Sequence, residues 1–434
     1  MKPYFKIILI VVIGISYNSM NGKNHDEILI DSLKSSHQIS FFGEGDVPDK
    51  DSVRALVDMF YLDQFRHFQD PRAPYFLFMS KDSKFAMGIG GVVRMRGWYD
   101  WGGVIEENGF IPYSIAIPRN EINRQKIAST PAGTALFFKV IGRNHRLGDY
   151  QIYIEANFNG YQARDFHLKK AYATINDWTI GYAMSSFSDP VTNPPTLDAQ
   201  GPSARVQTTA VLVRWMHNFN KNWTGAASLE MPNSQIDGNN TTTMACDDRL
   251  PNLAIFGQYS WNKSDHVRLS GILRNMTYRN LLIQQNKNEL GWGLQLSSIW
   301  HPTKQLVLYA TVNGGQGYGS FTGDLIMGNF DLINNPNRPG EMYTPSSIAW
   351  FGAAQYYIKN NVFVSMTLGQ ERFLPQHHVS PTTYKYGLYS AYNVFWDITP
   401  RVQVAAELNL GKRMNFDGHH NYARRFCLMA QFSF

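Results

Sequence analysis

The chain has 434 residues, of which 17% are charged and 14% are aromatic, with a formal net charge of +6 and a mean hydropathy of −0.30. This mixture is too polar for a bundle of transmembrane helices, and no uninterrupted apolar run of about 18 residues follows the N-terminal region. The basic residues come singly rather than in patches, which argues against a nucleic-acid-binding protein. The two cysteines, Cys246 and Cys427, are too few for a disulfide framework.

The N-terminus has the pattern of an export signal. Lys2 and Lys6 precede a short apolar core at 7–15, and small or polar residues follow it. A retained membrane anchor is the alternative, but the apolar core is short for a membrane span. We therefore predict a signal peptide at 1–19.

A short helix is predicted ahead of the main body of the chain. Residues 20–51 are polar and contain glycine and proline, so we interpret them as a linker. Ser52 can act as an N-cap, and apolar residues recur at helical spacing through 52–67. We expect 52–83 to be a short helical segment that lies either in the periplasm or inside the lumen of the domain that follows.

From residue 84 onward the sequence alternates between apolar and polar residues, which is the period of a β-strand with two unlike faces. At the C-terminus Phe432 and Phe434 fall on one row, and Gln431 and Ser433 fall on the other. A terminal aromatic on the apolar row is typical of the closing strand of an outer-membrane barrel. Sixteen strands are predicted, at 84–98, 133–143, 149–160, 164–175, 178–187, 204–217, 222–230, 252–262, 265–279, 287–301, 304–315, 346–359, 361–372, 384–398, 400–413 and 421–434.

Short and long connections alternate along this series of strands. Tight turns such as Asn176-Asp177 recur at every second connection, and tryptophans cluster near strand ends. Short periplasmic turns opposite long external loops are typical of outer-membrane barrels. We therefore predict that 84–434 is an all-β transmembrane antiparallel barrel of about sixteen strands, in the outer membrane of a Gram-negative bacterium. The long connections are 99–132, 188–203, 231–251, 316–345 and 373–383.

Strand parity predicts which charged side chains point into the barrel. In the first strand Met87 and Val93 fall on the apolar row, so Arg94 and Arg96 point inward. A charge on the lipid face at mid-depth costs about 2–4 kcal/mol, so a position in the lumen is favoured. The predicted pore-lining basic residues are Arg94, Arg96, Lys139, Lys169, Arg214, Arg268, Arg274, Arg413 and Arg425. The predicted pore-lining acidic residues are Glu155, Glu230, Glu289 and Glu407, and Glu371 has the same parity.

These residues predict a charged channel that favours anions. Sixteen strands leave an aqueous channel wide enough for small solutes, and an excess of guanidinium groups favours negative ones. The alternative is that these charges pair with one another and stabilise the wall. The connection 188–203 contains four prolines together with Asp189 and Asp198, and we expect it to fold inward as a constriction loop. A solvated surface loop is the alternative for this segment.

Four local strings carry the pattern of a known family. They are 408–418 with the following Ala423-Arg424-Arg425 and the Gln-Phe-Ser-Phe end, Val213-Arg214-Trp215, Ser228-Leu229-Glu230-Met231-Pro232, and Lys169-Lys170-Ala171-Tyr172. The chain from about residue 84 to the end resembles the DcaP-like trimeric porins. This resemblance implies a sixteen-stranded homotrimeric barrel that admits small, often negatively charged organic solutes such as dicarboxylates. Family members can carry a long N-terminal coiled coil, whereas only a short helix is expected here, and Lys169 stands where arginine is expected.

An outer-membrane hydrolase and a surface adhesin or receptor are the competing functions. The sequence has no Gly-x-Ser-x-Gly and no His-Glu-x-x-His motif, so we predict no enzymatic activity. An adhesin would use the long connections 99–132 and 316–345. His377-His378 and His419-His420 could share a metal ion, but we interpret them as solvated loop residues and predict no metal and no cofactor. The predicted function is therefore passive diffusion of small hydrophilic solutes, with lipid, lipopolysaccharide and small anionic solutes as partners and no nucleic acid.

Overall fold

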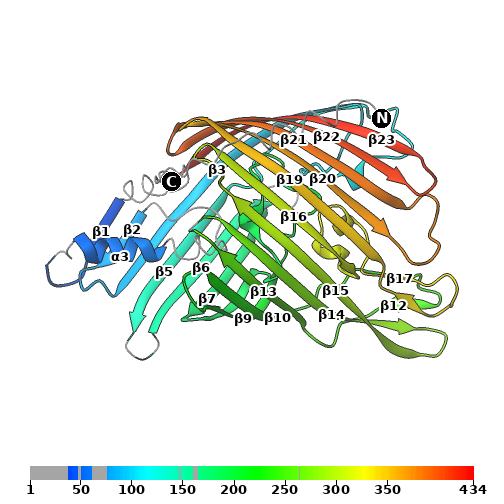
Figure 1. Ribbon diagram of the computed structural model, residues 1–434, viewed down its shortest axis with the longest axis horizontal. Helices are drawn as coiled ribbons and strands as arrows, with labels where there is room; N and C mark the ends of the chain where they lie inside the picture. The colour runs from blue at the N-terminus through cyan, green and yellow to red at the C-terminus, as the bar shows by residue number, and fades with distance from the viewer. Residues whose placement is uncertain are drawn as a thin grey trace.

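Sixteen long antiparallel strands close into one barrel in the computed structural model of the chain, which describes residues 38–46, 50–60, 76–144, 146, 148–159, 165–262 and 264–434 (Figure 1). Each long strand pairs with the next, and the last pairs with the first. The predicted fold class is therefore confirmed. The strands are β3 (Phe85–Trp101), β5 (Ala135–Asn144), β6 (Gly148–Asn159), β7 (Asp165–Ile175), β8 (Trp178–Met184), β9 (Thr209–Asn218), β10 (Trp223–Glu230), β13 (Asn252–Ser260), β14 (His266–Asn280), β15 (Gln285–Trp300), β16 (Leu306–Gln316), β19 (Ser346–Lys359), β20 (Val362–Leu374), β21 (Tyr384–Thr399), β22 (Val402–Asn415) and β23 (His420–Ser433).

The two faces of the strands differ in the way that the alternation predicts. On β15, Leu290, Leu294 and Leu296 are exposed on the outer face, whereas Gln295 and Ser297 are buried inside the barrel. The outer face can therefore contact lipid while polar groups face the lumen. No helix among the described residues is long and apolar enough to cross a membrane.

The seam of the barrel closes through backbone hydrogen bonds at the C-terminus. β23 pairs with β3 from Arg424 opposite Trp101 to Ser433 opposite Val92. Phe434 continues the ladder, because its N–H donates to Gly91 O at 3.0 Å and its carbonyl accepts from Gly91 N at 2.9 Å. A Cβ on Gly91 would lie 2.8 Å from the Ala135 carbonyl oxygen and 2.6 Å from Phe434 Cζ, so glycine suits this close approach of two backbones.

The long connections contain short elements that the alternation did not predict. β4 (Gln125–Thr130) pairs with the last residues of β3, from Arg96 to Trp101, and β12 (Thr243–Ala245) pairs with the end of β14. A separate small sheet joins two connections through β11 (Ile236–Asp237), β17 (Leu332–Asn334) and β18 (Met342–Tyr343). Four single-turn 3-10 helices also lie in these connections: η1 (Pro112–Ser114), η3 (Pro190–Thr192), η4 (Gly319–Phe321) and η5 (Leu325–Met327).

A small N-terminal unit covers one end of the barrel, the end that carries the short turns (Figure 1). β1 (Gln38–Phe42) runs parallel to β2 (Phe76–Ser80), and β2 pairs antiparallel with β3 beyond the end of β23. Helix α3 (Lys50–Phe60) packs its buried Leu56, Val57 and Phe60 in one apolar cluster with β2, β3 and β5.

The structure describes only part of the predicted N-terminal organisation. The helix expected at 52–67 is present as α3 at 50–60, and 61–75 lie outside the described residues. β1 falls within the predicted linker, and β2 falls within the predicted helical segment. Neither strand was predicted from the sequence. The predicted signal peptide at 1–19 also lies outside the described residues.

Candidate functional site: the charged lumen

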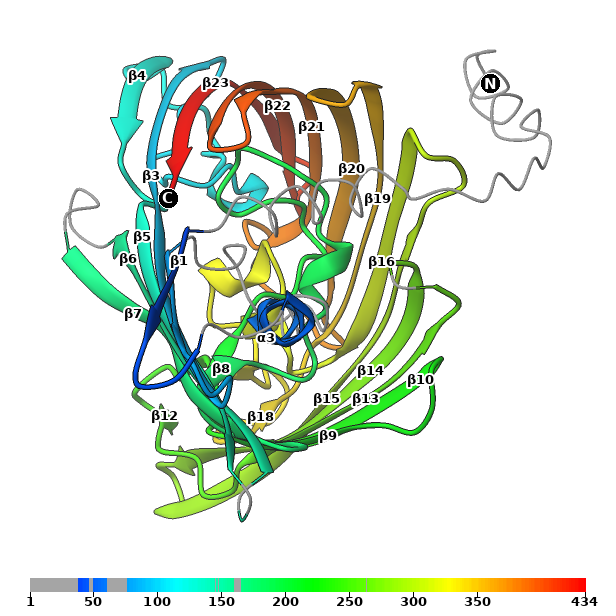
Figure 2. The same ribbon diagram turned by 90° about the vertical axis from the view of Figure 1, so that its left-hand side faces the viewer.

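The connection between β8 and β9, residues 185–208, runs inside the barrel, and we refer to it as the lumen loop (Figure 2). Most of its residues are buried, including Phe187, Leu197 and Val206. The backbone groups of these buried residues need hydrogen-bond partners other than bulk water. Inward-facing side chains of at least six strands supply those partners.

The first anchor holds the start of the lumen loop. Arg214 on β9 donates from Nη1 to Met184 O at 3.1 Å, and Glu230 on β10 accepts from Ser186 N at 2.9 Å. Ser228 donates from Oγ to Glu230 Oε1 at 2.6 Å. The predicted pore-lining residues Arg214 and Glu230 are both buried here.

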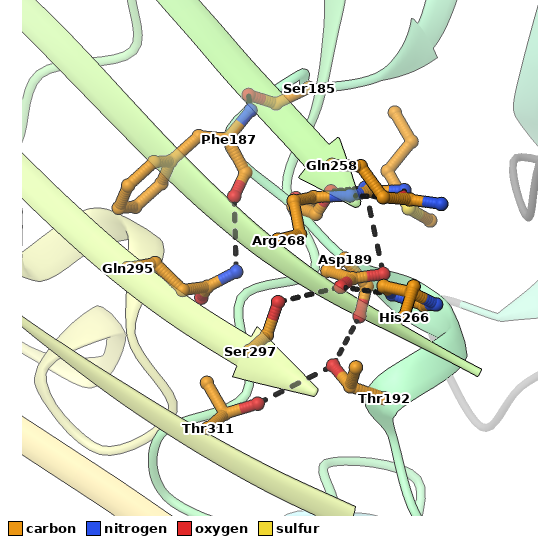
Figure 3. A network of polar contacts seen from close by, with 12 residues as sticks. Ser185, Phe187, Asp189, Thr192, Gln258, His266, Arg268, Gln295, Ser297 and Thr311 are labelled. Atoms are coloured by element: carbon orange, nitrogen blue, oxygen red, sulfur yellow. Dashed lines mark hydrogen bonds and ion pairs between the residues drawn. The ribbon is translucent and has the colours of Figure 1, made fainter. Parts of the chain in front are cut away.

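The second anchor is Asp189, which lies against β14 and β15 (Figure 3). Its Oδ1 lies 3.5 Å from Arg268 Nη1, and its Oδ2 accepts from Ser297 Oγ at 2.6 Å and lies 2.9 Å from His266 Nε2. Arg268 also donates from Nη1 to Ser188 O at 3.0 Å. Burial on its own would raise the pKa of Asp189, but the positive charge of Arg268 and the contacts with His266 and Ser297 outweigh burial and hold the pKa below its ordinary value.

The second anchor brings together a serine, a histidine and an aspartate, but not in a catalytic order. In a hydrolytic triad the histidine contacts the serine hydroxyl and takes its proton. Here Ser297 donates directly to Asp189, and His266 contacts the same carboxylate oxygen. All three side chains are buried, so the arrangement fits a structural anchor rather than a nucleophile.

The third anchor joins the middle of the lumen loop to β22 and β3. Glu407 accepts from Leu197 N at 2.9 Å and from Asp198 N at 2.8 Å, and Arg96 donates from Nη1 to Leu197 O at 2.8 Å. Asp198 accepts from Phe110 N at 2.7 Å, which joins the lumen loop to the connection 102–124. Burial raises the pKa of the Asp198 carboxyl above its ordinary value.

The connection 317–345 also folds against the lumen loop. Gly323 N donates to Ser203 O at 2.8 Å, and Gln200 Nε2 donates to Gly323 O at 3.1 Å. Arg274 holds this connection to the wall, because its Nη1 lies 3.0 Å from Asp331 Oδ2 and donates to Gly317 O at 2.7 Å. Three connections from the long-loop end of the barrel therefore meet inside it.

Two more predicted basic residues bind the connection 102–124. Arg413 donates to Tyr113 O, and its guanidinium lies 4.9 Å from the centre of the Tyr113 ring. Arg425 forms a buried ion pair with Asp100 and donates from Nη2 to Ile105 O at 2.8 Å.

The part of the lumen nearest the short turns carries a second group of charges. Lys139 is buried beneath α3 and donates from Nζ to Phe60 O at 2.6 Å, where the negative end of the helix dipole lies. Glu155 lies 2.7 Å from Lys169 Nζ and 3.5 Å from Lys170 Nζ. Arg94 is half-buried and donates from Nε to Gln431 Oε1 at 2.8 Å.

The predicted lumenal charges therefore fall into two sets. Twelve side chains are buried, most of them in contacts with the folded connections or α3, and four are half-buried. The buried set is Arg96, Lys139, Arg214, Arg268, Arg274, Arg425, Glu155, Glu230, Glu371, Glu407, Asp189 and Asp198. The half-buried set is Arg94, Lys169, Arg413 and Glu289. The part that either set plays in selecting solutes stays a prediction.

Sequence parity missed several partners of these charges. Asp331 and Asp324 lie in a long connection, where the period-2 rule gives no direction. Asp100 lies beyond the predicted end of the first strand, although β3 reaches Trp101. Lys170 was missed because a register shift at Glu155 and Ala156 leaves Lys169 without an opposite residue and turns both lysines inward.

No group of three or more histidine, cysteine or carboxylate side chains in the described part of the chain is placed to hold a metal ion. His377 lies edge-on to the Tyr343 ring, with ring centres 4.6 Å apart, and His419 lies 3.1 Å from Asp417. The two histidine pairs thus contact different partners.

No protein-family description and no curated protein matches the sequence. Solved structures match it by fold. The outer membrane channel DcaP of Acinetobacter baumannii has 17% sequence identity and a TM-score of 0.70, with 82% of this chain and 99% of that chain covered. OmpT, an outer membrane protein of Vibrio cholerae, has 9% identity and a TM-score of 0.53, with 81% and 98% covered. OmpF of Salmonella typhi, in complex with daunomycin, has 8% identity and a TM-score of 0.50, with 80% and 98% covered. The chain has the fold of these outer-membrane proteins, so the predicted resemblance to DcaP-like porins and the predicted outer-membrane location are confirmed at the level of the fold.

Proposed function

We propose that this chain is an outer-membrane porin through which small hydrophilic solutes diffuse passively. The observation that carries this proposal is a closed sixteen-stranded barrel with an apolar outer face and a polar, charged inner wall. A barrel of this size encloses an aqueous channel when its interior is not filled. The lumen loop is held along the wall by three anchors, an arrangement that narrows a channel.

We further propose that the channel favours small anionic organic solutes. Among the predicted lumenal charges, the half-buried ones are the basic Arg94, Lys169 and Arg413 and the acidic Glu289. Solutes contact accessible groups more strongly than buried ones, so these four side chains give the accessible part of the channel a net positive charge. Guanidinium groups also bind carboxylates through two parallel hydrogen bonds, which suits organic acids.

The test is single-channel conductance in planar bilayers, with the reversal potential measured under a KCl gradient. We expect ohmic steps with anion preference, and a smaller preference in the double variant R94A/K169A. A matched control is K304A/K359A, which removes two exposed lysines near the short turns at the rim. A cation preference in the native protein would contradict the proposed preference for anions. If folded protein forms no channels, the proposed porin function is wrong.

We propose that the chain is not an enzyme and that it forms a homotrimer. The order of contacts in the Ser297, Asp189 and His266 cluster supports the first point, since the serine lacks a base. The resemblance to trimeric porins supports the second. Light scattering of the detergent-solubilised protein should give the mass of three chains, and the mass of one chain would contradict trimer formation.

A further inference from the structure

We propose that the outer wall of the barrel carries a binding site for the phosphorylated headgroup of lipopolysaccharide, the glycolipid of the outer leaflet. The site is a group of five side chains on four adjacent strands, which we call the rim patch. It consists of Arg372 on β20, Tyr386 on β21, Lys412 on β22, and Tyr422 and Arg424 on β23.

The strand register makes the rim patch continuous. Arg372 lies opposite Tyr386, Lys412 lies opposite Tyr422, and Arg424 lies two residues further along β23 on the same face. Cross-strand neighbours on one face of a sheet contact each other directly. The outward direction follows from the exposure of Tyr422 and Arg424, and from Leu388, which lies opposite Lys412 and is exposed.

Two of the three cations of the rim patch, Arg372 and Lys412, contact aromatic rings rather than acids. Arg372 Cζ lies 5.5 Å from the centre of the Tyr386 ring, and Lys412 Nζ lies 5.6 Å from the centres of the Tyr386 and Tyr422 rings. Among the described residues no carboxylate forms an ion pair with Arg372, Lys412 or Arg424. A ring orders a cation without neutralising it. Two ordered cations, Arg372 and Lys412, and the exposed Arg424 therefore give this outer face three positive charges that no acid of the described residues neutralises.

The position of the rim patch identifies the anion as a lipid headgroup. The patch lies near the long-loop ends of its strands, beside the connections 375–383 and 416–419. Further along the same outer face, toward the short turns, the exposed side chains are apolar, including Leu388, Phe426 and Leu428. An amphipathic ligand with phosphates at the rim and acyl chains along this apolar wall satisfies both parts of the surface.

The experiment measures lipid A binding to the full chain in detergent by native mass spectrometry. Bisphosphorylated lipid A and enzymatically dephosphorylated lipid A serve as the two probes. The test variant is R372Q/K412Q/R424Q, and the control is K221Q/K304Q/K359Q, which removes three exposed lysines near the short turns. We expect bisphosphorylated lipid A to bind the test variant about a hundredfold more weakly, at about fivefold for each cation removed, and the control to bind like the native protein.

Two results would contradict a phosphate-dependent lipid site. Equal binding of both lipid A forms to the native protein, or unchanged binding in the test variant, would overturn the proposal. A change in oligomeric mass in the test variant with no dependence on phosphate would assign the patch to contacts between copies of this chain instead. The single variant K412Q, checked for heat-modifiable migration, provides the same comparison if the triple variant does not fold. We expect the triple variant and K412Q to conduct like the native protein, so this test is separate from the test of the porin function.

Discussion

Arg425 on the closing strand and Asp100 on the first strand form a buried two-point ion pair across the seam of the barrel. Arg425 Nε lies 2.6 Å from Asp100 Oδ1, and Arg425 Nη2 lies 2.9 Å from Asp100 Oδ2. The two residues are direct partners in the β23 and β3 register. The same guanidinium donates to Ile105 O, so one side chain joins the seam to the connection 102–124.

The variant R425A should destabilise the barrel by about 3–5 kcal/mol, because removing one partner of a buried ion pair leaves the other charge without compensation. The measurement is the loss of heat-modifiable migration, or of the β-sheet circular dichroism signal, on heating in detergent. R424A is the matched control, since the adjacent Arg424 is exposed on the outer face. Equal unfolding temperatures for R425A and R424A would contradict this role.

The strands could be predicted from the sequence because their period depends only on which face meets lipid. All sixteen predicted segments contain a strand, and parity placed Arg214, Arg268 and Arg425 inside the barrel. The prolines and aspartates of 188–203 predict that this segment, which is part of the lumen loop, folds inward. Its partners could not be predicted, because an anchor such as Asp189 with Arg268 joins residues 79 positions apart in sequence through the closed sheet.

The bulge at Lys169 shows a different limit of sequence parity. One extra residue in a strand reverses the direction of every side chain beyond it, and the sequence carries no signal for it at this position. Lys169 and Lys170 therefore both face Glu155, which is buried between them. The local charge is positive by one, from two lysines and one glutamate.

The variant E155Q should increase anion preference, on the proposed channel function, because it leaves the two lysines without their carboxylate. The reversal potential under a KCl gradient should shift toward the chloride equilibrium potential. Y153F is the matched control, since it removes the hydroxyl 3.1 Å from Glu155 Oε2 without changing charge. An unchanged reversal potential in E155Q would show that solutes do not sense this cluster.

The variant D189N should loosen the lumen loop and raise single-channel conductance or current noise. It removes the carboxylate that contacts Arg268 and His266, and we expect the anchor to weaken by about 3 kcal/mol, as for a broken buried ion pair. D247N, a change at an exposed loop aspartate, is the control and should conduct like the native protein. A native conductance and noise level in D189N would mean that the other two anchors suffice.

The connection 317–345 contains a buried acid, Asp324, that lies beside a second buried acid, Glu371 on β20. Asp324 N donates to Glu371 Oε2 at 2.7 Å, and Tyr384 Oη donates to Asp324 Oδ2 at 2.6 Å. Burial raises the pKa of Asp324 to about 7, and Arg413 is the cation that opposes this effect. The folded protein therefore binds a proton at Asp324 over a pH range in which the unfolded chain, with an ordinary pKa of 3.8, has released it.

The variant D324N should be more stable than the native protein at pH 8 and equal to it near the ordinary pKa of 3.8. Because the folded state holds more protons between the two pKa values, native stability falls as pH rises through this range and is then constant above about pH 7. An asparagine is neutral at every pH, and its amide oxygen can still accept from Tyr384, so the variant avoids a loss of at most about 4 kcal/mol. Thermal unfolding of both proteins across this pH range measures the difference. A D324N protein that is less stable than the native protein at pH 8 would show that the ionised carboxylate, not the protonated acid, holds this connection in place.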